Sequence, residues 1–295
     1  MFKTITLKPT KEKSILRRHP WVFSGAIKAI ENGISNGEIV EIKSNKGRFL
    51  GYGHYNEGSI AIRIFELNQL TIDNAYWEGK IKKAISQRHK NLDINGKNNI
   101  YRLVHAEGDE MPGCIIDRYD NVIVMQFHSV GMWKLKEIFS KTIAKQLPEI
   151  DVIYDKSENT LPEVLKQEFQ IQNSYLLRKI DAPDVIASEY GNQFKINWVT
   201  GQKTGFFIDQ RENRKLLGEY SQNKVILNTF CYSGGFSIYA LNKGAKEVYS
   251  LDSSKKAMKL VEENVKLLPQ DLQQKHHSIT DDAMDYIKQL PETFD

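Results

Sequence analysis

Apolar and polar residues alternate in short runs through the first part of the chain, up to about residue 65. Isoleucine, for example, stands at every second position in Ile60, Ile62 and Ile64. Glycine and asparagine residues separate the runs, as at residues 32–33, 36–37 and 56–58. Because alternation with a period of two predicts half-buried strands, many short strands joined by such turns predict a small β-barrel.

A helical pattern follows between Asp73 and Leu92. Apolar residues recur there at spacings of three and four, which places them on one face of a helix, and Asp73 is a suitable N-cap. The other face is expected to be cationic. The apolar face consists of Tyr76, Trp77, Ile81, Ala84 and Ile85, and the cationic face of Lys80, Lys82, Lys83 and Arg88.

Further strands are predicted at residues 101–105, 114–117, 122–127 and 152–154, with a helix at 133–146. Strands that arrive in hairpins before one helix indicate an α+β module. Cys114 lies in an apolar strand of this region. We expect it to be a core residue, because free cysteine is among the most buried residue types.

The most informative pattern runs from residue 224 to residue 252. An apolar run, VILNTF at 225–230, leads into the turn CYSGG at 231–235, a helical pattern begins at 238, and a second apolar run ends at Asp252. This order predicts a βαβ unit of a Rossmann-like domain. In such units the ligand lies beyond the carboxyl ends of the strands, where an acidic residue in the position of Asp252 faces a ribose.

The glycine pattern bears on which ligand this is. A dinucleotide fold normally carries Gly-x-Gly-x-x-Gly to seat a pyrophosphate, whereas only the adjacent Gly234 and Gly235 occur here. Loss of the third glycine is tolerable if the ligand has no phosphate, as is true of S-adenosylmethionine. That cofactor is the favoured hypothesis, and a dinucleotide or a purely structural turn are the alternatives.

Composition places the chain among globular proteins of two or three domains. It has 295 residues, of which 40% are hydrophobic and 26% charged. No apolar run reaches ~18 residues and the start lacks the apolar core of a signal peptide, so a cytoplasmic protein without membrane contact is expected. Two cysteines cannot form a metal cluster, and His276 and His277 are expected to be a solvated pair, so no metal is expected.

The positive charge is concentrated at the start of the chain. Residues 1–75 contain 11 Lys or Arg against 7 Asp or Glu, a net of +4 that equals the excess of the whole chain. A basic excess confined to one module indicates a polyanion contacted through that module.

A cluster of cations precedes two aromatic residues in this module. Lys13, Arg17 and Arg18 come shortly before Trp21 and Phe23. Cations with a nearby aromatic suit phosphate contacts and stacking on a base, which is how RNA is recognised. The alternative is a solvated helical face beside a buried tryptophan.

A polar segment precedes the βαβ unit. After a predicted hairpin at 189–196, residues 200–214 place many polar groups around two aromatics, and a helix is predicted from Asp209 to about Tyr220. Such a loop could cover a bound ligand, with Gln210 and Arg211 as donors at the helix start. The alternative is that Arg211 and Arg214 only pair with local acids.

Three motifs resemble the ribosomal RNA large subunit methyltransferase I family. They are KTGFFIDQR at 203–211, LNTFCYSGGFS at 227–237 and LDSS at 251–254, and RRHPWVFSG at 17–25 resembles part of a PUA domain. The resemblance implies a PUA-like RNA-binding barrel at 1–72, a central α+β domain at 73–185 and a class I, Rossmann-like methyltransferase domain at 186–295. It also implies a cytoplasmic enzyme that forms 5-methylcytosine in 23S ribosomal RNA.

The same resemblance implies which residues bind the cofactor. The turn would surround the methionine part, Asp252 would accept from the ribose hydroxyls, Asp282 would contact adenine, and Gln210 and Arg211 would close the site. The full set is Gln210, Arg211, Phe230, Tyr232, Ser233, Gly234, Asp252, Ser253 and Asp282, with Lys13, Arg17 and Arg18 as the RNA-binding candidates.

Residues 290–295 approach a fourth strand, so the Rossmann-like domain is expected to be incomplete and the chain truncated. In the family an Asp-Pro-Pro motif and the cysteine that attacks C6 of cytosine come later. No catalytic residue is therefore expected in this chain, which alone should not transfer methyl groups, and Cys231 is expected to be a packing or loop residue.

The expected partner is RNA, above all 23S ribosomal RNA, and a homodimer is a possible assembly. Two alternatives to this function remain. One is a methyltransferase of another RNA base with the same cofactor. The other is a non-catalytic RNA-binding protein with a vestigial cofactor fold.

Overall fold

The computed structural model describes residues 2–290 and 293–295. The expectation for the last residues of the chain therefore falls partly on 291 and 292, which lie outside the described residues. The chain packs as two units: one runs up to Leu92 and continues as Arg102–Ile180, and the other comprises Asp93–Tyr101 and Asp181–Asp295. The first unit holds most of the first two expected domains, whose boundaries stay predictions.

The first residues of the first unit form a curved mixed sheet around an apolar core. Its strand order is β2-β6-β5-β4-β1-β3. Ile5, Ile42 and Ile62 are fully buried in this core, as the alternating pattern predicts. The elements are β1 (Lys3–Leu7), α1 (Lys13–Leu16), β2 (Trp21–Phe23), β3 (Ile27–Ile30), β4 (Ile39–Lys43), β5 (Phe49–Tyr55) and β6 (Ile60–Glu66).

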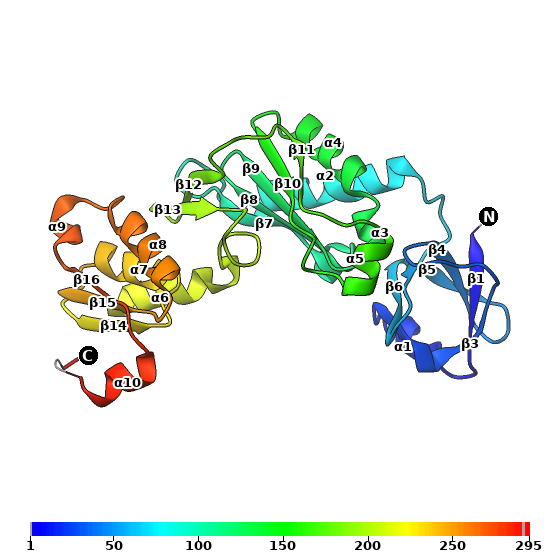
Figure 1. Cartoon of the computed structure of the whole chain (residues 1–295). Helices are drawn as coiled ribbons and strands as arrows, with labels where there is room; N and C mark the ends of the chain where they lie inside the picture. Colours follow the sequence, from blue (N-terminus) through cyan, green and yellow to red (C-terminus); the bar gives the residue numbers. More distant parts are fainter. Residues whose placement is uncertain (1, 291–292) are drawn as a thin grey trace. The chain divides into compact units, whose positions relative to one another are not determined.

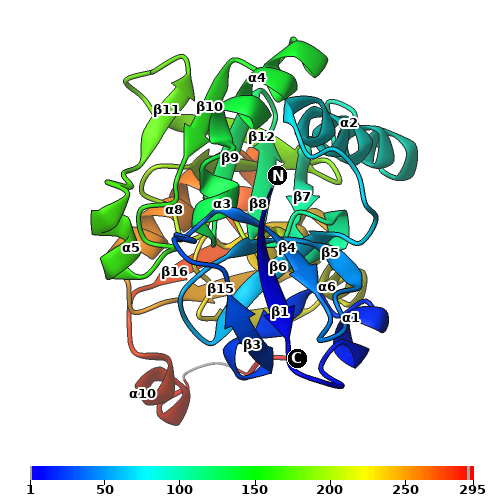
Figure 2. The same ribbon diagram turned by 90° about the vertical axis from the view of Figure 1, so that its right-hand side faces the viewer.

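Helix α2 (Asn74–Asn91) forms where the helical pattern predicts it. The Asp73 carboxylate caps it by accepting from the Tyr76 N–H at 2.9 Å. Trp77, Ile81, Ala84 and Ile85 of its apolar face are buried. The helix packs beside α4 (Lys136–Gln146), and the two lie side by side in Figures 1 and 2.

The cations expected on the second face of α2 form ion pairs with carboxylates. Lys80 is buried, with its Nζ 2.6 Å from Glu110 Oε2 and 3.9 Å from Glu66 Oε2. Arg88 forms a two-pronged pair with Asp109 at 2.5 Å. The remaining cations, Lys82 and Lys83, pair with Glu78 and Glu110.

The rest of the first unit is a sheet with the order β11-β10-β9-β8-β7. Cys114 is fully buried in it, as expected. The helix expected at 133–146 is instead two helices, since Lys134 and Leu135 separate α3 from α4. The elements are β7 (Ile100–His105), β8 (Cys114–Tyr119), β9 (Val122–Phe127), α3 (Val130–Trp133), α4, β10 (Val152–Asp155), α5 (Glu163–Glu168) and β11 (Ser174–Leu177).

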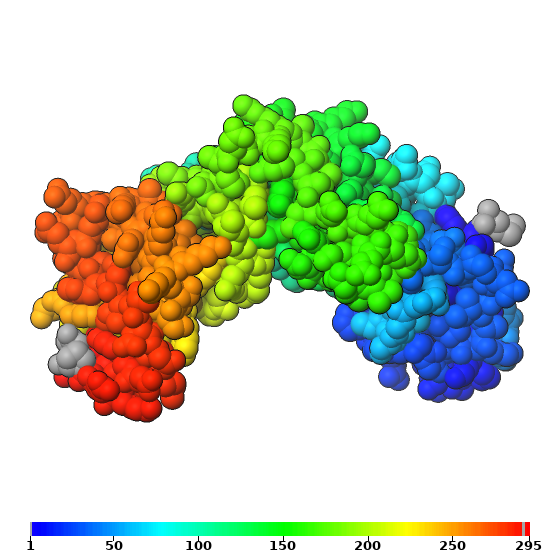
Figure 3. Space-filling view, viewed as in Figure 1, coloured from blue at the N-terminus to red at the C-terminus, as the bar shows by residue number. Residues whose placement is uncertain are grey.

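The second unit combines a hairpin with a parallel sheet of order β14-β15-β16. Helices α7 and α8 pack against this sheet (Figure 1), and Figure 3 shows α10, coloured red, at the surface of the unit. The elements are β12 (Asp184–Glu189), β13 (Asn192–Asn197), α6 (Arg211–Tyr220), β14 (Val225–Thr229), α7 (Gly235–Asn242), β15 (Glu247–Leu251), α8 (Lys255–Val265), α9 (Gln270–Gln273), β16 (His276–Ile279) and α10 (Ala283–Lys288).

His276 and His277 belong to β16. The expectation of a solvated pair is wrong for His276, whereas the His277 side chain is 42% exposed. The Nε2 of His276 lies 2.7 Å from the Ser250 hydroxyl, and burial, helped by His277, lowers its pKa to about 4. The ring of His277 stacks on Tyr249 with ring centroids 4.3 Å apart. Both side chains therefore take part in packing the sheet.

Two properties of the described residues bear on function. None of the described helices is both long and apolar enough to cross a bilayer. Within residues 2–290 and 293–295, no group of three or more His, Cys, Asp or Glu side chains is arranged to hold a metal ion.

The close approach of β5 and β6 gives a test of the barrel. A Cβ atom on Gly53 would lie 2.4 Å from Ile62 Cγ2 and 2.7 Å from the Arg63 carbonyl oxygen. We expect Gly53→Ala to lower the free energy of unfolding by about 2 kcal/mol or more, because overpacking forces backbone shifts. Gly25→Ala is the control, since a Cβ there meets nothing within 4 Å. Equal urea denaturation midpoints for both variants would contradict this packing.

Candidate functional site

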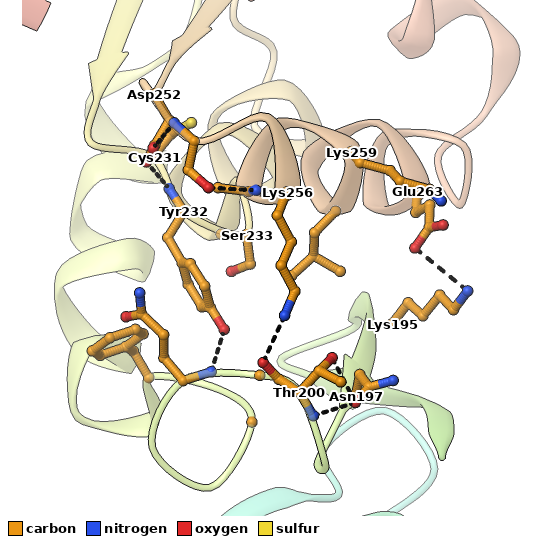
Figure 4. A pocket seen from close by; sticks show the side chains of 18 of the residues that line it. Lys195, Asn197, Thr200, Cys231, Tyr232, Ser233, Asp252, Lys256, Lys259 and Glu263 are labelled. Carbon is orange, nitrogen blue, oxygen red and sulfur yellow. Dashed lines mark hydrogen bonds and ion pairs between the residues drawn. The ribbon is translucent and has the colours of Figure 1, made fainter. Parts of the chain in front are cut away.

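A pocket of about 850 Å³ opens in the second unit between the hairpin, the turn after β14 and helix α8. It contains both carboxylates and cations, with apolar surface from aromatic residues. Figure 4 shows its polar side chains. Residues that line it include Lys195, Asn197, Thr200, Gln202, Phe207, Gln210, Arg214, Phe230, Cys231, Tyr232, Ser233, Gly235, Asp252, Ser254, Lys256, Lys259 and Glu263.

The turn after β14 has a strained backbone. Phe230 has a φ of 54° and Tyr232 a φ of 47°, although both carry bulky side chains, and Gly234 follows at 72°. Bulky residues with positive φ angles are outliers that persist only where the surrounding structure imposes them, and they cluster at functional sites. Phe230 is also 72% exposed at the pocket. The turn therefore has the marks of a binding loop.

Asp252 holds this turn. It directly follows β15, and its carboxylate accepts from the Tyr232 N–H at 3.1 Å and from the Ser254 N–H at 2.9 Å. Figure 4 shows Asp252 beside Cys231 and Tyr232. Because each carboxylate oxygen can accept more than one hydrogen bond, the group remains able to bind hydroxyls of a ligand.

The first residues of α7 supply backbone donors at the same place. N–H groups in the first turn of a helix have no partner within the helix, and they carry the positive end of its dipole. Gly235 is the first residue of α7 and lines the pocket. An anionic group such as a carboxylate would therefore be stabilised there.

The first part of the predicted polar loop lines the pocket, with Thr200, Gly201, Gln202 and Gly205. Its Gln202 N–H donates to the Tyr232 hydroxyl at 2.8 Å, and the Lys256 ammonium donates to the Thr200 carbonyl at 3.1 Å (Figure 4). The ring of Phe207 packs edge-on against Tyr232 at 5.3 Å. The loop is thus fastened to both the turn and α8.

The structure brings some of the predicted cofactor residues together. Gln210, Phe230, Tyr232, Ser233 and Asp252 all line the pocket, and Gly234 lies between two residues that do. Their contacts with a cofactor stay predictions.

The side chains of three other predicted cofactor ligands do not line the pocket. The Arg211 guanidinium lies 3.3 Å from Glu189 and also donates to the Ile100 carbonyl. Asp282 caps α10 by accepting from Met284 N–H at 2.8 Å, and Ser253 is exposed outside the lining residues. As cofactor ligands these three remain predictions that the pocket geometry does not support directly.

Arg214 also lines the pocket, and in the sequence it was named only in the alternative that it pairs with a local acid. It pairs instead with Glu189, 25 positions earlier. The only signal in the sequence was its position three residues after Arg211, on the same side of helix α6. Lys195 and Glu263, 3.4 Å apart in the pocket wall, carried no motif at all.

In the first unit the RNA-binding candidates are exposed. Lys13, Arg17 and Arg18 have no carboxylate within ion-pair distance among the described residues. The indole N–H of Trp21 donates to Glu107 at 2.9 Å, which holds this side chain in place. Phe23, in contrast, is 47% exposed. Phe23 is therefore better placed than Trp21 to stack on a base.

Comparisons with known proteins agree with this geometry. A PUA-like domain model matches residues 5–67, and the S-adenosylmethionine-dependent methyltransferase family model matches residues 177–283. These matches confirm the expected fold class and the expected cofactor.

Curated relatives match nearly the whole chain. One from Pseudoalteromonas atlantica is 38% identical over 268 residues, which cover 90% of this chain and 66% of that protein. One from Tolumonas auensis is 37% identical over 277 residues, covering 92% and 68%. Both are named "Ribosomal RNA large subunit methyltransferase I". The chain spans about two thirds of the length of these relatives.

Solved structures share the fold. A Streptococcus mutans protein described as a SAM-dependent methyltransferase superposes with a TM-score of 0.80 over 98% of this chain and 73% of its own, at 20% identity. A second structure, described as a methyltransferase complexed with SAH, gives a TM-score of 0.82 over 98% of this chain and 72% of that chain, also at 20% identity. At this identity the likeness concerns the fold alone.

The environment of Cys231 predicts a poor nucleophile. Its sulfur lies 3.7 Å from Met258 Sδ, and burial, with a contribution from Asp252, raises its pKa to about 12. At pH 8 we expect iodoacetamide to alkylate Cys231 on the order of 100-fold more slowly in the folded than in the unfolded chain, because the thiolate is the reactive form. Mass spectrometry of the Cys231 peptide measures this. Equal rates in both states would contradict the buried assignment.

Proposed function

We propose that this chain, which belongs to the ribosomal RNA large subunit methyltransferase I family, carries the cofactor-binding and RNA-positioning residues of an S-adenosylmethionine-dependent RNA methyltransferase. One observation carries the proposal. The strained turn at 230–234, the start of α7 and Asp252 all border one pocket.

The donor and acceptor groups of this pocket suit S-adenosylmethionine. The first N–H groups of α7 suit the methionine carboxylate, and Asp252 suits the ribose hydroxyls. S-adenosylmethionine has no phosphate, so it does not need the glycine-rich N–H cluster that binds the pyrophosphate of a dinucleotide. The turn has only Gly234 and Gly235, which favours this cofactor over a dinucleotide. When bound, it supplies an activated methyl group, and the chain's own residues orient it and limit access of water.

The proposed cofactor ligands differ in how well the geometry supports them. Gln210, Phe230, Tyr232, Ser233 and Asp252 line the pocket. Gly234 is proposed because its left-handed backbone shapes the turn. The remaining candidates, Arg211, Ser253 and Asp282, do not line the pocket and stay predictions.

RNA is the proposed substrate, and the barrel is proposed to position it. The exposed Lys13, Arg17 and Arg18 suit phosphates, and Phe23 suits a stacked base. The names of the relatives support a large-subunit ribosomal RNA as the substrate. Cytosine C5 of 23S ribosomal RNA is the proposed site of methylation, and this finer proposal rests on the resemblance of the motifs alone. Mass spectrometry of nucleosides from methylated RNA separates this product from methylation of another base.

A cytoplasmic location follows from a ribosomal RNA substrate and is part of the same proposal. The homodimer stays a prediction. The alternative of a vestigial cofactor fold predicts RNA affinity without any affinity for S-adenosylmethionine.

The role of Asp252 gives the first test. We expect Asp252→Asn to raise the dissociation constant for S-adenosylmethionine about 10-fold to 100-fold, since hydrogen bonds to a charged group contribute about 1.5–3 kcal/mol. Isothermal titration calorimetry measures it, with Asp271→Asn in the exposed part of α9 as the control. Unchanged affinity in the Asp252 variant would count against this pocket as the cofactor site.

The basic cluster gives the second test. Replacing Lys13, Arg17 and Arg18 together by alanine should weaken RNA binding and reduce the slope of log affinity against log salt by about 0.7–0.9 for each phosphate that the variant no longer neutralises. Replacing Lys28, Lys43 and Lys46 of the same barrel removes equal charge and is the control. Equal reductions in both triple variants would mean that net charge, not this cluster, determines binding.

A further inference from the structure

A buried ion pair lies behind the pocket. Glu189, the last residue of β12, has a fully buried carboxylate. The guanidinium of Arg214 in α6 is also buried and binds this carboxylate in two places, Nε to Oε1 and Nη2 to Oε2, each at 2.8 Å. The Tyr239 hydroxyl of α7 donates to Glu189 Oε1 at 3.0 Å, and Arg211 Nε lies 3.3 Å from Oε2.

The same arginine touches both walls of the pocket. Its Nη1 donates to the Phe207 carbonyl at 2.9 Å, and its guanidinium lies over the Phe206 ring, 4.6 Å from the centroid. On the other side its stem passes under the glycine turn, so close that a Cβ on Gly235 would lie 3.0 Å from Arg214 Cδ. Arg214 therefore connects the Phe206-Phe207 segment with the start of α7.

We propose that Arg214, held by Glu189, is a positioning residue that sets the start of α7 and the Phe206-Phe207 segment at the spacing that binds the cofactor. This inference rests on the proposed function of the pocket. It goes beyond that function because it makes the affinity for the cofactor depend on the buried pair of Arg214 and Glu189, which no sequence motif indicates.

The geometry explains why an arginine is needed. A guanidinium has donors in a rigid fork, so it can bind both carboxylate oxygens and still donate one more hydrogen bond, here to Phe207. A lysine carries the same charge but lacks the fork and cannot hold all three contacts in one geometry. The tyrosine of α7 ties the helix to the same carboxylate. Small displacements of these elements would misplace the N–H groups of α7.

The alternative is that the pair only stabilises the second unit. Breaking a buried ion pair is destabilising wherever it lies. The two roles differ in one measurable respect: a stabilising pair changes the melting temperature but leaves the affinity of the folded chain unchanged.

The test compares Arg214→Lys, Glu189→Gln and Tyr239→Phe with the wild-type chain. Affinity for S-adenosylhomocysteine is measured by calorimetry at a temperature where circular dichroism shows each variant to be folded, and the melting temperature is measured without ligand. Tyr239→Phe removes only the hydroxyl, which contacts the Glu189 carboxylate at 3.0 Å and the Glu189 carbonyl at 3.1 Å, and it removes no charge, so it serves if the other variants do not fold. The matched control is Arg102→Lys in the first unit, where Arg102 binds the buried Asp117 at 2.8 Å and 3.1 Å.

We expect Arg214→Lys to weaken the affinity about tenfold, the size of one hydrogen bond from a charged donor. Tyr239→Phe should act in the same direction by a smaller factor, and Arg102→Lys should lower the melting temperature at unchanged affinity. If every folded variant among Arg214→Lys, Glu189→Gln and Tyr239→Phe had wild-type affinity, the positioning role would be overturned while the proposed function would remain intact. Absence of binding by the wild-type chain would overturn both.

Discussion

The left-handed turn between β14 and α7 is the constraint on which the candidate site depends. Phe230 and Tyr232 hold positive φ angles there, and each such residue costs on the order of 1–3 kcal/mol. The end of β15 offsets this cost. Leu251 accepts from the Cys231 N–H at 3.2 Å and Asp252 accepts from the Tyr232 N–H at 3.1 Å. The pairing of parallel strands therefore fixes the turn, and the turn aims the first N–H groups of α7.

Local patterns in the sequence were sufficient to predict most elements. The alternation at 60–64, the cap at Asp73 and the glycine turn each reflect contacts within a few residues or a regular period, and the corresponding strands and helices form. Asp252 could be placed at the pocket for the same reason, because strand ends in a βαβ unit meet at one edge.

Contacts between residues far apart in sequence were not predictable in this way. Lys80 reads as a surface cation on a helical wheel, but Glu110 lies 30 positions later and Glu66 is brought close by the barrel. Arg214 and Glu189 are separated by 25 positions, which include strand β13 and the polar loop. His276 follows no apolar period, yet the register of β15 and β16 brings it to Ser250. In each case a contact with a residue distant in sequence determines that the side chain is buried, and the local sequence does not reveal that contact.

An NMR titration of the isotope-labelled chain with S-adenosylhomocysteine tests the central claim most directly, because it reports on every backbone amide at once. A cofactor site at the turn predicts chemical-shift changes concentrated on residues 231–237 and 252–254. Changes confined to other segments, or no change at millimolar ligand, would contradict it.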